Sequence, residues 1–136
     1  MANNPSFQEQ AQRELDAFLP NHDRLPISAD SNKLPYIRAL IREGQRVFAP
    51  ALLGFHHYIE QDDEYNVYHI PANSLLLINI HCISFDEARY KNATEFDPYR
   101  FIDVKQSMAS SANGPSEKRD HLVLEVEEGF ALEFIW

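Results

Sequence analysis

Glu43 and Arg46 are the first residues whose types and spacing could do chemistry, and they lie in the segment LPYIRALIREGQR. Residues three apart share one face of a helix, so this carboxylate and this guanidinium can pair. An exposed pair of this kind contributes only about 0.2–0.5 kcal/mol. A buried pair needs good geometry and further hydrogen bonds to offset its lost hydration. Spacing alone favours the surface pair.

Three histidines and one cysteine form a second group of candidates. Imidazoles are common metal ligands, so His56, His57 and His69 could in principle bind an ion. Adjacent strand residues point to opposite faces, however, so His56 and His57 would rarely reach one ion together. We therefore expect no metal site. Cys82 is the single cysteine, so an internal disulfide is excluded. It continues a predicted apolar strand, where a free cysteine most often behaves as a small buried hydrophobic residue.

Two amphipathic helices are predicted to carry the N-terminal half of the chain. The first spans residues 5–18, where apolar side chains recur at helical spacing. The second spans residues 35–47, because Pro35 suits a first turn and Pro50 ends the helix. Residues 19–32 contain prolines and several Asp, Asn and Ser residues, which predicts a loop.

Short strands are predicted to follow the helices. HHYIE (residues 56–60) and VYHIP (residues 67–71) flank the turn-rich QDDEYN and look like a two-stranded unit, with strands expected near residues 56–60 and 66–70. Residues 75–79, within SLLLINI, are apolar enough for a strand that is buried on both faces. The pattern of residues 86–103 is irregular. The fold class is therefore α+β, and no linker divides the chain.

Composition limits the partners that the chain can have. Its 136 residues are 44% hydrophobic, which argues against general disorder. The net charge of −9 disfavours nucleic acid and anionic membrane surfaces. No apolar run has the length of a transmembrane helix, and the N-terminal stretch is polar, unlike a signal peptide.

In their order along the chain, these segments resemble the cytochrome P-450 family of haem-thiolate monooxygenases, and most of all the broad-substrate members common in fungi. Glu43 and Arg46 match the family's Glu-x-x-Arg helix, and FDPYRF resembles its Phe-x-Pro-x-Arg-Phe segment, which adds Arg100. The resemblance implies that these three side chains form a buried ion triad with a structural role. It covers residues 4 to about 123 and implies a fragment of a mainly helical fold: two helices, a small β-sheet, an irregular meander and an incomplete core.

The resemblance also implies roles for residues outside the triad. His57 matches a position that hydrogen-bonds a haem propionate, although it could equally be a solvated histidine at a strand edge. Ala51, Leu52 and Leu53 match a stretch that lines the substrate pocket, although ordinary apolar packing would explain them as well. The intact protein would bind haem (heme), oxidise a small apolar organic substrate with O2 and receive NADPH electrons from a reductase at the endoplasmic reticulum membrane.

The C-terminal residues depart from the family pattern. The family places Phe-x-x-Gly-x-Arg-x-Cys-x-Gly after the polar loop, and its thiolate is the axial ligand of the haem iron. LEVEEGFALEFIW stands here instead and contains no cysteine. Reverse-translated and read out of register, it can encode Gly-Gly-Gly-Arg-Arg-Ile-Cys-Pro-Gly-Ile-His-Leu. We therefore interpret residues 1–124 as a partial cytochrome P-450 domain and residues 125–136 as an out-of-frame tail.

This interpretation predicts what the chain can do by itself. Cys82 is not expected to be the haem ligand, because it precedes the Arg100 segment whereas the family's ligand follows it. The chain is expected to bind no haem, to be inactive and, without an anchor, to be cytoplasmic. The alternative is a non-catalytic remnant or interaction fragment that never carries haem.

Overall fold

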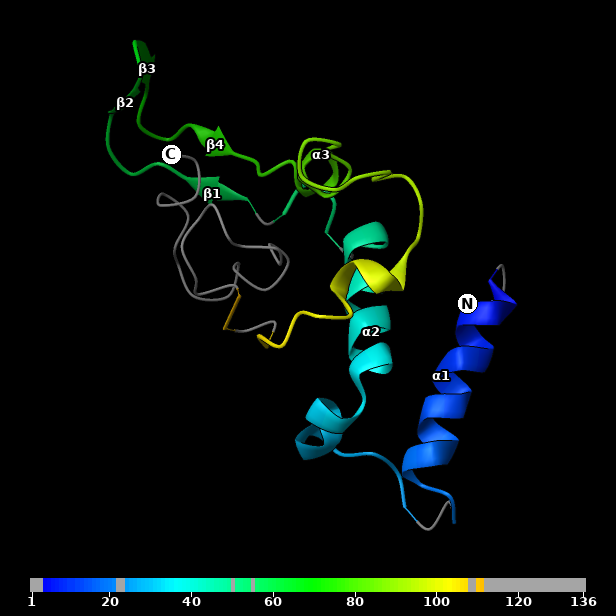
Figure 1. Cartoon of the computed structure of the whole chain (residues 1–136). Coiled ribbons are helices and arrows are strands. Elements are labelled where there is room, and N and C mark those ends of the chain that lie inside the picture. The colour runs from blue at the N-terminus through cyan, green and yellow to red at the C-terminus, as the bar shows by residue number, and fades with distance from the viewer. Residues whose placement is uncertain (1–3, 22–23, 50, 55, 108–109, 112–136) are drawn as a thin grey trace.

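The computed structural model describes residues 4–21, 24–49, 51–54, 56–107 and 110–111 (Figure 1). The out-of-frame tail expected at residues 125–136 lies outside the described residues. Helices form one part of the molecule, and short strands extend from it toward the β2–β3 hairpin. The elements in chain order are α1 (Pro5–Phe18), η1 (Ser28–Lys33), α2 (Pro35–Val47), β1 (His57–Tyr58), β2 (Asp63–Tyr65), β3 (Tyr68–Ile70), β4 (Leu75–Leu76), α3 (Ile80–Ser84) and η2 (Pro98–Phe101).

Helices α1 and α2 lie side by side and have the bounds that the sequence predicts. Ala11 of α1 packs with Tyr36 and Leu40 of α2, and Phe7 and Ile37 extend this cluster. Each helix begins with a proline, whose missing N–H costs nothing at a position without an intrahelical partner. The regularly spaced apolar residues of the two helices therefore pack against each other, as expected.

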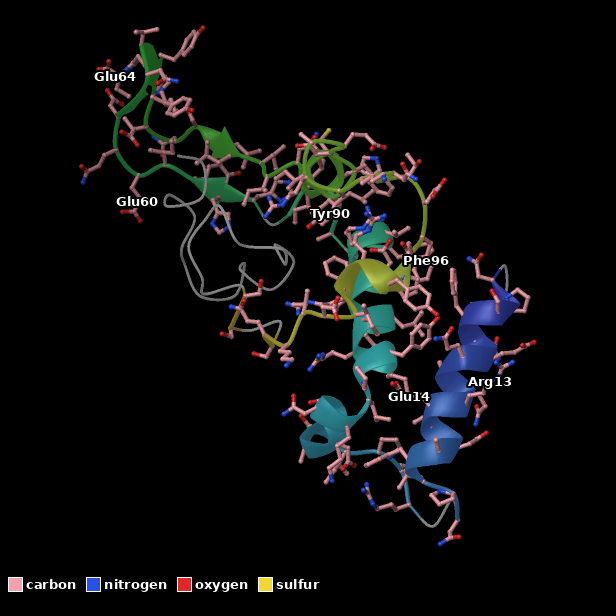
Figure 2. All side chains as sticks on the ribbon, viewed as in Figure 1. Arg13, Glu14, Glu60, Glu64, Tyr90 and Phe96 are labelled. Carbon is pink, nitrogen blue, oxygen red and sulfur yellow. The ribbon has the colours of Figure 1, made fainter. Side chains whose placement is uncertain are left out.

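Glu14 joins α1 to the first turn of α2. Its carboxylate accepts the N–H groups of Tyr36 and Ile37, at 2.9 and 2.8 Å. The first N–H groups of a helix lack intrahelical partners, and a negative charge there is favoured by the helix dipole. Figure 2 shows Glu14 on the α2 side of α1, with Arg13 on the opposite side. One side chain thus supplies the cap that α2 lacks locally.

The connection between α1 and α2 is more ordered than the loop predicted for residues 19–32, because it contains η1. Asp30 accepts two hydrogen bonds from the Arg24 guanidinium and one from the Ile27 N–H. These bonds, those from Arg24 above all, hold the pKa of Asp30 below its ordinary value. The stability they contribute is present at neutral pH and is lost as the pH falls through the lowered pKa of the folded state.

The strand pairing differs from the prediction. His57–Tyr58 pairs with Leu75–Leu76, whereas Tyr68–Ile70 pairs with Asp63–Tyr65 from the expected turn QDDEYN. The described residues therefore hold two separate two-stranded sheets, not one unit of residues 56–60 and 66–70. The prediction was wrong because the turn lies at Asn66, whose φ of 54° is in the left-handed region that asparagine tolerates.

The apolar segment SLLLINI is not a strand buried on both faces. Only Leu75–Leu76 is extended, Leu77 is half-exposed, and the chain then enters α3. The Asn79 side chain accepts the Cys82 N–H at 3.0 Å and so caps α3. Cys82 is exposed, which corrects the expectation of a small buried residue in a strand.

Several large apolar side chains remain in contact with solvent. Val67 and Leu25 are more than four-fifths exposed, and Phe48 is 70% exposed. Scattered apolar residues are normal at a surface, but this many on a short chain indicates faces without packing partners. In the described part of the chain, no helix combines the length and apolar character needed to cross a membrane.

The Glu14 contact predicts a specific loss of helical structure. Glu14→Ala should destabilise the pairing of α1 and α2 by about 1–2 kcal/mol, because two N–H groups lose their acceptor. The urea midpoint followed by far-ultraviolet circular dichroism would measure this loss. Glu9→Ala is the matched control, since Glu9 is exposed and makes only a 3.4 Å ion pair with Arg13. Equal midpoints for the two variants would contradict the capping role.

The open apolar faces predict a weakly cooperative fold. The chain expressed alone should be poorly soluble or partly unfolded and should melt over a broad temperature range, because its exposed apolar surface lacks partners. Differential scanning calorimetry, with the oligomeric state checked by sedimentation, measures this. A sharp, cooperative transition of a monomer would show instead that the chain is an independent domain.

Candidate functional site

The Glu43 carboxylate is fully buried beside two guanidinium groups. Arg46 donates from Nε to Oε2 at 2.8 Å and from Nη2 to Oε1 at 2.7 Å, a bidentate pair. The side chains of Glu43 and Arg46 are 0% and 2% exposed. Arg100 brings its Nε to 3.6 Å from Oε1, an electrostatic contact longer than a hydrogen bond. The surface pair that spacing alone favours is therefore wrong.

Arg46 also organises the irregular segment that follows α3. Its Nη1 donates to the carbonyl oxygens of Ser84 and Ala93, at 2.6 and 2.7 Å, and its Nη2 donates to that of Glu95 at 3.2 Å. Arginine suits this position, because its planar fork can pair with a carboxylate and still donate to other acceptors.

The third partner, Arg100, enters from η2. Glu43 Oε1 accepts the Asp97 N–H at 2.9 Å, just before η2 begins. The Asp97 side chain accepts the Tyr99 N–H and so caps η2. Arg100 Nη1 donates to the Lys91 carbonyl at 2.6 Å. Glu43 thus holds the segment between α3 and η2 at Asp97, and Arg100 holds it at Lys91.

The cluster carries one negative and two positive charges, so the excess positive charge needs other stabilising groups. The carbonyl oxygens that Arg46 and Arg100 contact supply negative dipole ends. The negative face of the Tyr90 ring also stabilises this positive charge, since the Arg46 and Arg100 guanidinium groups lie 5.2 and 5.9 Å from the ring centroid. Tyr90 lies near the end of α2 in Figure 2. It also packs with Ala39, Ala93 and Phe101 in a second apolar cluster.

The other sequence-predicted site residues lie on β1 and in the turn after α2. His57 is half-buried on β1, where it pairs with Leu76. Leu52 and Leu53 are 53% and 50% exposed in the turn after α2, and Ala51 is half-buried. Tight apolar packing therefore does not explain Leu52 and Leu53.

The histidines among the described residues show no metal-binding arrangement. His69 Nε2 lies 3.8 Å from the Asp62 carboxylate, and both side chains are largely exposed. Within the described ranges, no group of three or more His, Cys, Asp or Glu side chains converges on a point that could hold a metal ion.

Two structurally important residues were missed by the sequence analysis, although a signal for each exists. Glu14 follows buried Ala11 by three positions and so falls on the packed face of α1. Arg42 precedes Arg46 by four positions and so shares its buried face. Its Nη1 donates to the Gln106 carbonyl at 2.7 Å. Both are charged residues on a packed helix face, and here they make contacts between elements.

Known proteins resemble this chain in sequence and in fold. The family model described as Cytochrome P450 matches residues 1–119. The chain belongs to the cytochrome P450 family. Cytochrome P450 monooxygenase 69 of Postia placenta is 35% identical over 123 residues, which are 90% of this chain and 22% of that protein. Cytochrome P450 monooxygenase virE of Hypocrea virens is 38% identical over 120 residues, which are 88% and 21% of the two chains.

Solved structures agree with the sequence relatives. A zebra fish cytochrome P450 determined with abiraterone superimposes with a TM-score of 0.69 at 26% identity, over 78% of this chain and 26% of that one. The same comparison for a zebra fish structure with progesterone gives 0.69 at 28% identity. This P450 chain therefore spans about a fifth of the curated relatives and a quarter of the solved ones. The α+β fold class and the fragment are confirmed.

Membership of the P450 family implies haem in the intact protein, but the donor set of this chain does not fit a thiolate-bound haem. The single cysteine, Cys82, is an exposed residue of α3. It lies two positions before Ser84, whose carbonyl accepts Arg46, and so borders the ion cluster instead of following η2. Residues 112–136, after η2, include no cysteine in the sequence.

The buried cluster predicts the effect of removing its negative charge. Glu43→Gln keeps the size of the side chain but leaves two guanidinium groups without a carboxylate, which should cost about 3–5 kcal/mol. Amide hydrogen exchange of α2 and circular dichroism should then show loss of the folded helix pair.

Glu64→Gln is the control for this experiment, because Glu64 is exposed on β2 and should change little. If Glu43→Gln also changed the unfolding free energy by only about 0.5 kcal/mol, Glu43 and Arg46 would be behaving as a surface pair.

Proposed function

We propose that this chain is the part of a haem-dependent monooxygenase that runs from the Glu-x-x-Arg helix to the meander, and that its contribution is structural. The observation that carries the proposal is the buried contact of Glu43 with Arg46 and Arg100. This contact links α2 to η2 and orders the irregular segment between α3 and η2. None of the three side chains takes a catalytic role in this proposal.

The intact protein, in this proposal, inserts oxygen from O2 into a small apolar organic substrate at haem iron. A reductase supplies the electrons from NADPH, at the endoplasmic reticulum membrane. The names of the fungal relatives, which are cytochrome P450 monooxygenases, support this reaction class. The acidic charge of the chain is consistent with a partner other than nucleic acid.

Two segments would face the haem and the substrate in the intact protein. We assign His57, half-buried on β1, to a haem propionate. We assign Ala51, Leu52 and Leu53 to the wall of the substrate pocket, since their apolar surface is open where ordinary core packing would have closed it. This turn ends at Gly54, whose φ of 62° lies in the left-handed region and which passes close to Ile78 and Ile80.

The chain as it stands does not carry out this reaction in our proposal, because its axial ligand is missing. Residues 125–136 are interpreted as out-of-frame sequence that replaces the cysteine loop. The extent of the family match supports this interpretation, since the match ends at residue 119. The large exposed side chains also support the alternative of a non-catalytic remnant or interaction fragment.

A carbon monoxide difference spectrum separates these possibilities. The purified chain with added haem, reduced under carbon monoxide, should give no thiolate-type Soret band, because no cysteine occupies the ligand loop. The full-length gene with one base restored before codon 124 should give the band, and replacing the cysteine encoded by the restored frame should abolish it.

Two outcomes would contradict the proposal. A thiolate-type band from the chain itself, lost in Cys82→Ser, would make Cys82 the ligand. Genomic sequence with stop codons throughout the region upstream of codon 1, and no band after the base is restored, would favour the remnant.

A further inference from the structure

Tyr99 of η2 contacts both helices of the helix pair, although half of its side chain is exposed. The side chain is 50% exposed, yet its hydroxyl donates to Gln10 Oε1 of α1 at 2.7 Å. Its ring packs against that of Tyr36, at the start of α2, with the two centroids 5.7 Å apart. The next residue, Arg100, is the one that approaches the buried Glu43 carboxylate. Tyr99 therefore lies between α1 and the ion cluster.

A series of hydrogen bonds connects Tyr99 to that carboxylate. The Tyr99 N–H donates to Asp97 Oδ1 at 3.0 Å, and the Asp97 N–H donates to Glu43 Oε1 at 2.9 Å. Gln10, at one end of the series, belongs to α1, and Glu43, at the other end, belongs to α2. A contiguous series of this kind can couple the position of α1 to the buried cluster, and a measured coupling energy is the test of it.

A second contact holds the same stretch of chain against α1. The ring centroids of Phe96 and Phe7 are 5.6 Å apart. Phe7 and Gln10 are three positions apart and so lie on one face of α1. The stretch from Phe96 to Tyr99 thus meets this face through one apolar contact and one hydrogen bond. The apolar contact supplies burial, and the hydrogen bond is the one that depends on orientation.

We propose that Tyr99 is a positioning residue for the Glu43 cluster, because its bond to Gln10 ties the placement of η2, and of Arg100 with it, to α1. This inference rests on the structural role proposed above for the cluster and adds α1 to the elements that hold it. Arg100 Nε lies 3.6 Å from Glu43 Oε1, beyond hydrogen-bond length, so a small shift of η2 changes this pairing. Removal of the Tyr99 hydroxyl should loosen η2 before it loosens α2.

Hydrogen exchange of two amides in the full chain tests this inference. The Asp97 amide reports on the contact with Glu43, and the amide of Ala39, a buried residue of the second apolar cluster, reports on α2. Tyr99→Phe removes only the hydroxyl. It should speed exchange at Asp97 by about two- to tenfold, the net effect of one hydrogen bond, and leave Ala39 unchanged. Tyr68→Phe is the matched control, since Tyr68 is 70% exposed on β3, and it should change neither amide.

Variants of Gln10 separate this one bond from a general loss of stability. Gln10→Leu removes the acceptor and should match Tyr99→Phe. Gln10→Glu keeps an acceptor at the same position and should retain the slow exchange. Gln10→Leu combined with Tyr99→Phe should have no further effect, because both changes break the same bond.

Three results would overturn the inference. The first is exchange at Asp97 that is no faster in Tyr99→Phe than in Tyr68→Phe. The second is an additive effect of Gln10→Leu and Tyr99→Phe, which would show that the two side chains act independently. The third is an equal acceleration at Asp97 and Ala39, which would show that the hydroxyl stabilises the helix pair as a whole and does not position η2.

Glu43→Gln separates this inference from the proposed function. If Glu43→Gln speeds exchange at Asp97 and Tyr99→Phe does not, only the positioning role of Tyr99 fails. If neither amide responds to Glu43→Gln, the structural role of the cluster fails, and the inference fails with it.

Discussion

The buried carboxylate of Glu43 is the interaction on which the rest of the structure depends. It receives two hydrogen bonds from Arg46, one from the Asp97 N–H and the charge of Arg100. The segment from α3 to η2 has almost no regular secondary structure, and local turns satisfy only part of its backbone. Arg46 and Glu43 of α2 add partners for the carbonyl groups of Ser84, Ala93 and Glu95 and for the Asp97 N–H.

The helices could be predicted from the sequence because their signals are local. Apolar spacing predicted the bounds of α1, and Pro35 and Pro50 predicted those of α2. The strands could not be predicted as reliably, because they are two or three residues long and their pairing depends on where the turns fall. The apolar run before α3 reads as a strand on hydrophobicity alone. The Asn79 cap is the local signal that turns it into a helix.

The members of the candidate site were identifiable, but their burial was not. A Glu-x-x-Arg spacing says that two side chains share a helix face, and it does not say what covers that face. The burial of the pair depends on residues about 40 to 50 positions away. These are Ser84, Ala93 and Glu95, whose carbonyl groups accept from the remaining Arg46 donors. Glu14 was missed for a related reason, since the two N–H groups that donate to its carboxylate lie on the next helix.

The attachment of Ser84 and Ala93 to the same Arg46 nitrogen has a consequence for how such a chain can vary. One guanidinium group holds both ends of the intervening loop within a few ångströms, whatever path the loop takes between them. The entropic cost of closing a longer loop grows only slowly, by about 0.6 kcal/mol for each doubling of its length. A longer loop between these two anchors therefore adds little closure entropy. The cost of an insertion there is set instead by whether Tyr90 keeps its place in the apolar cluster and whether the Lys91 and Asn92 carbonyl groups still reach Arg100.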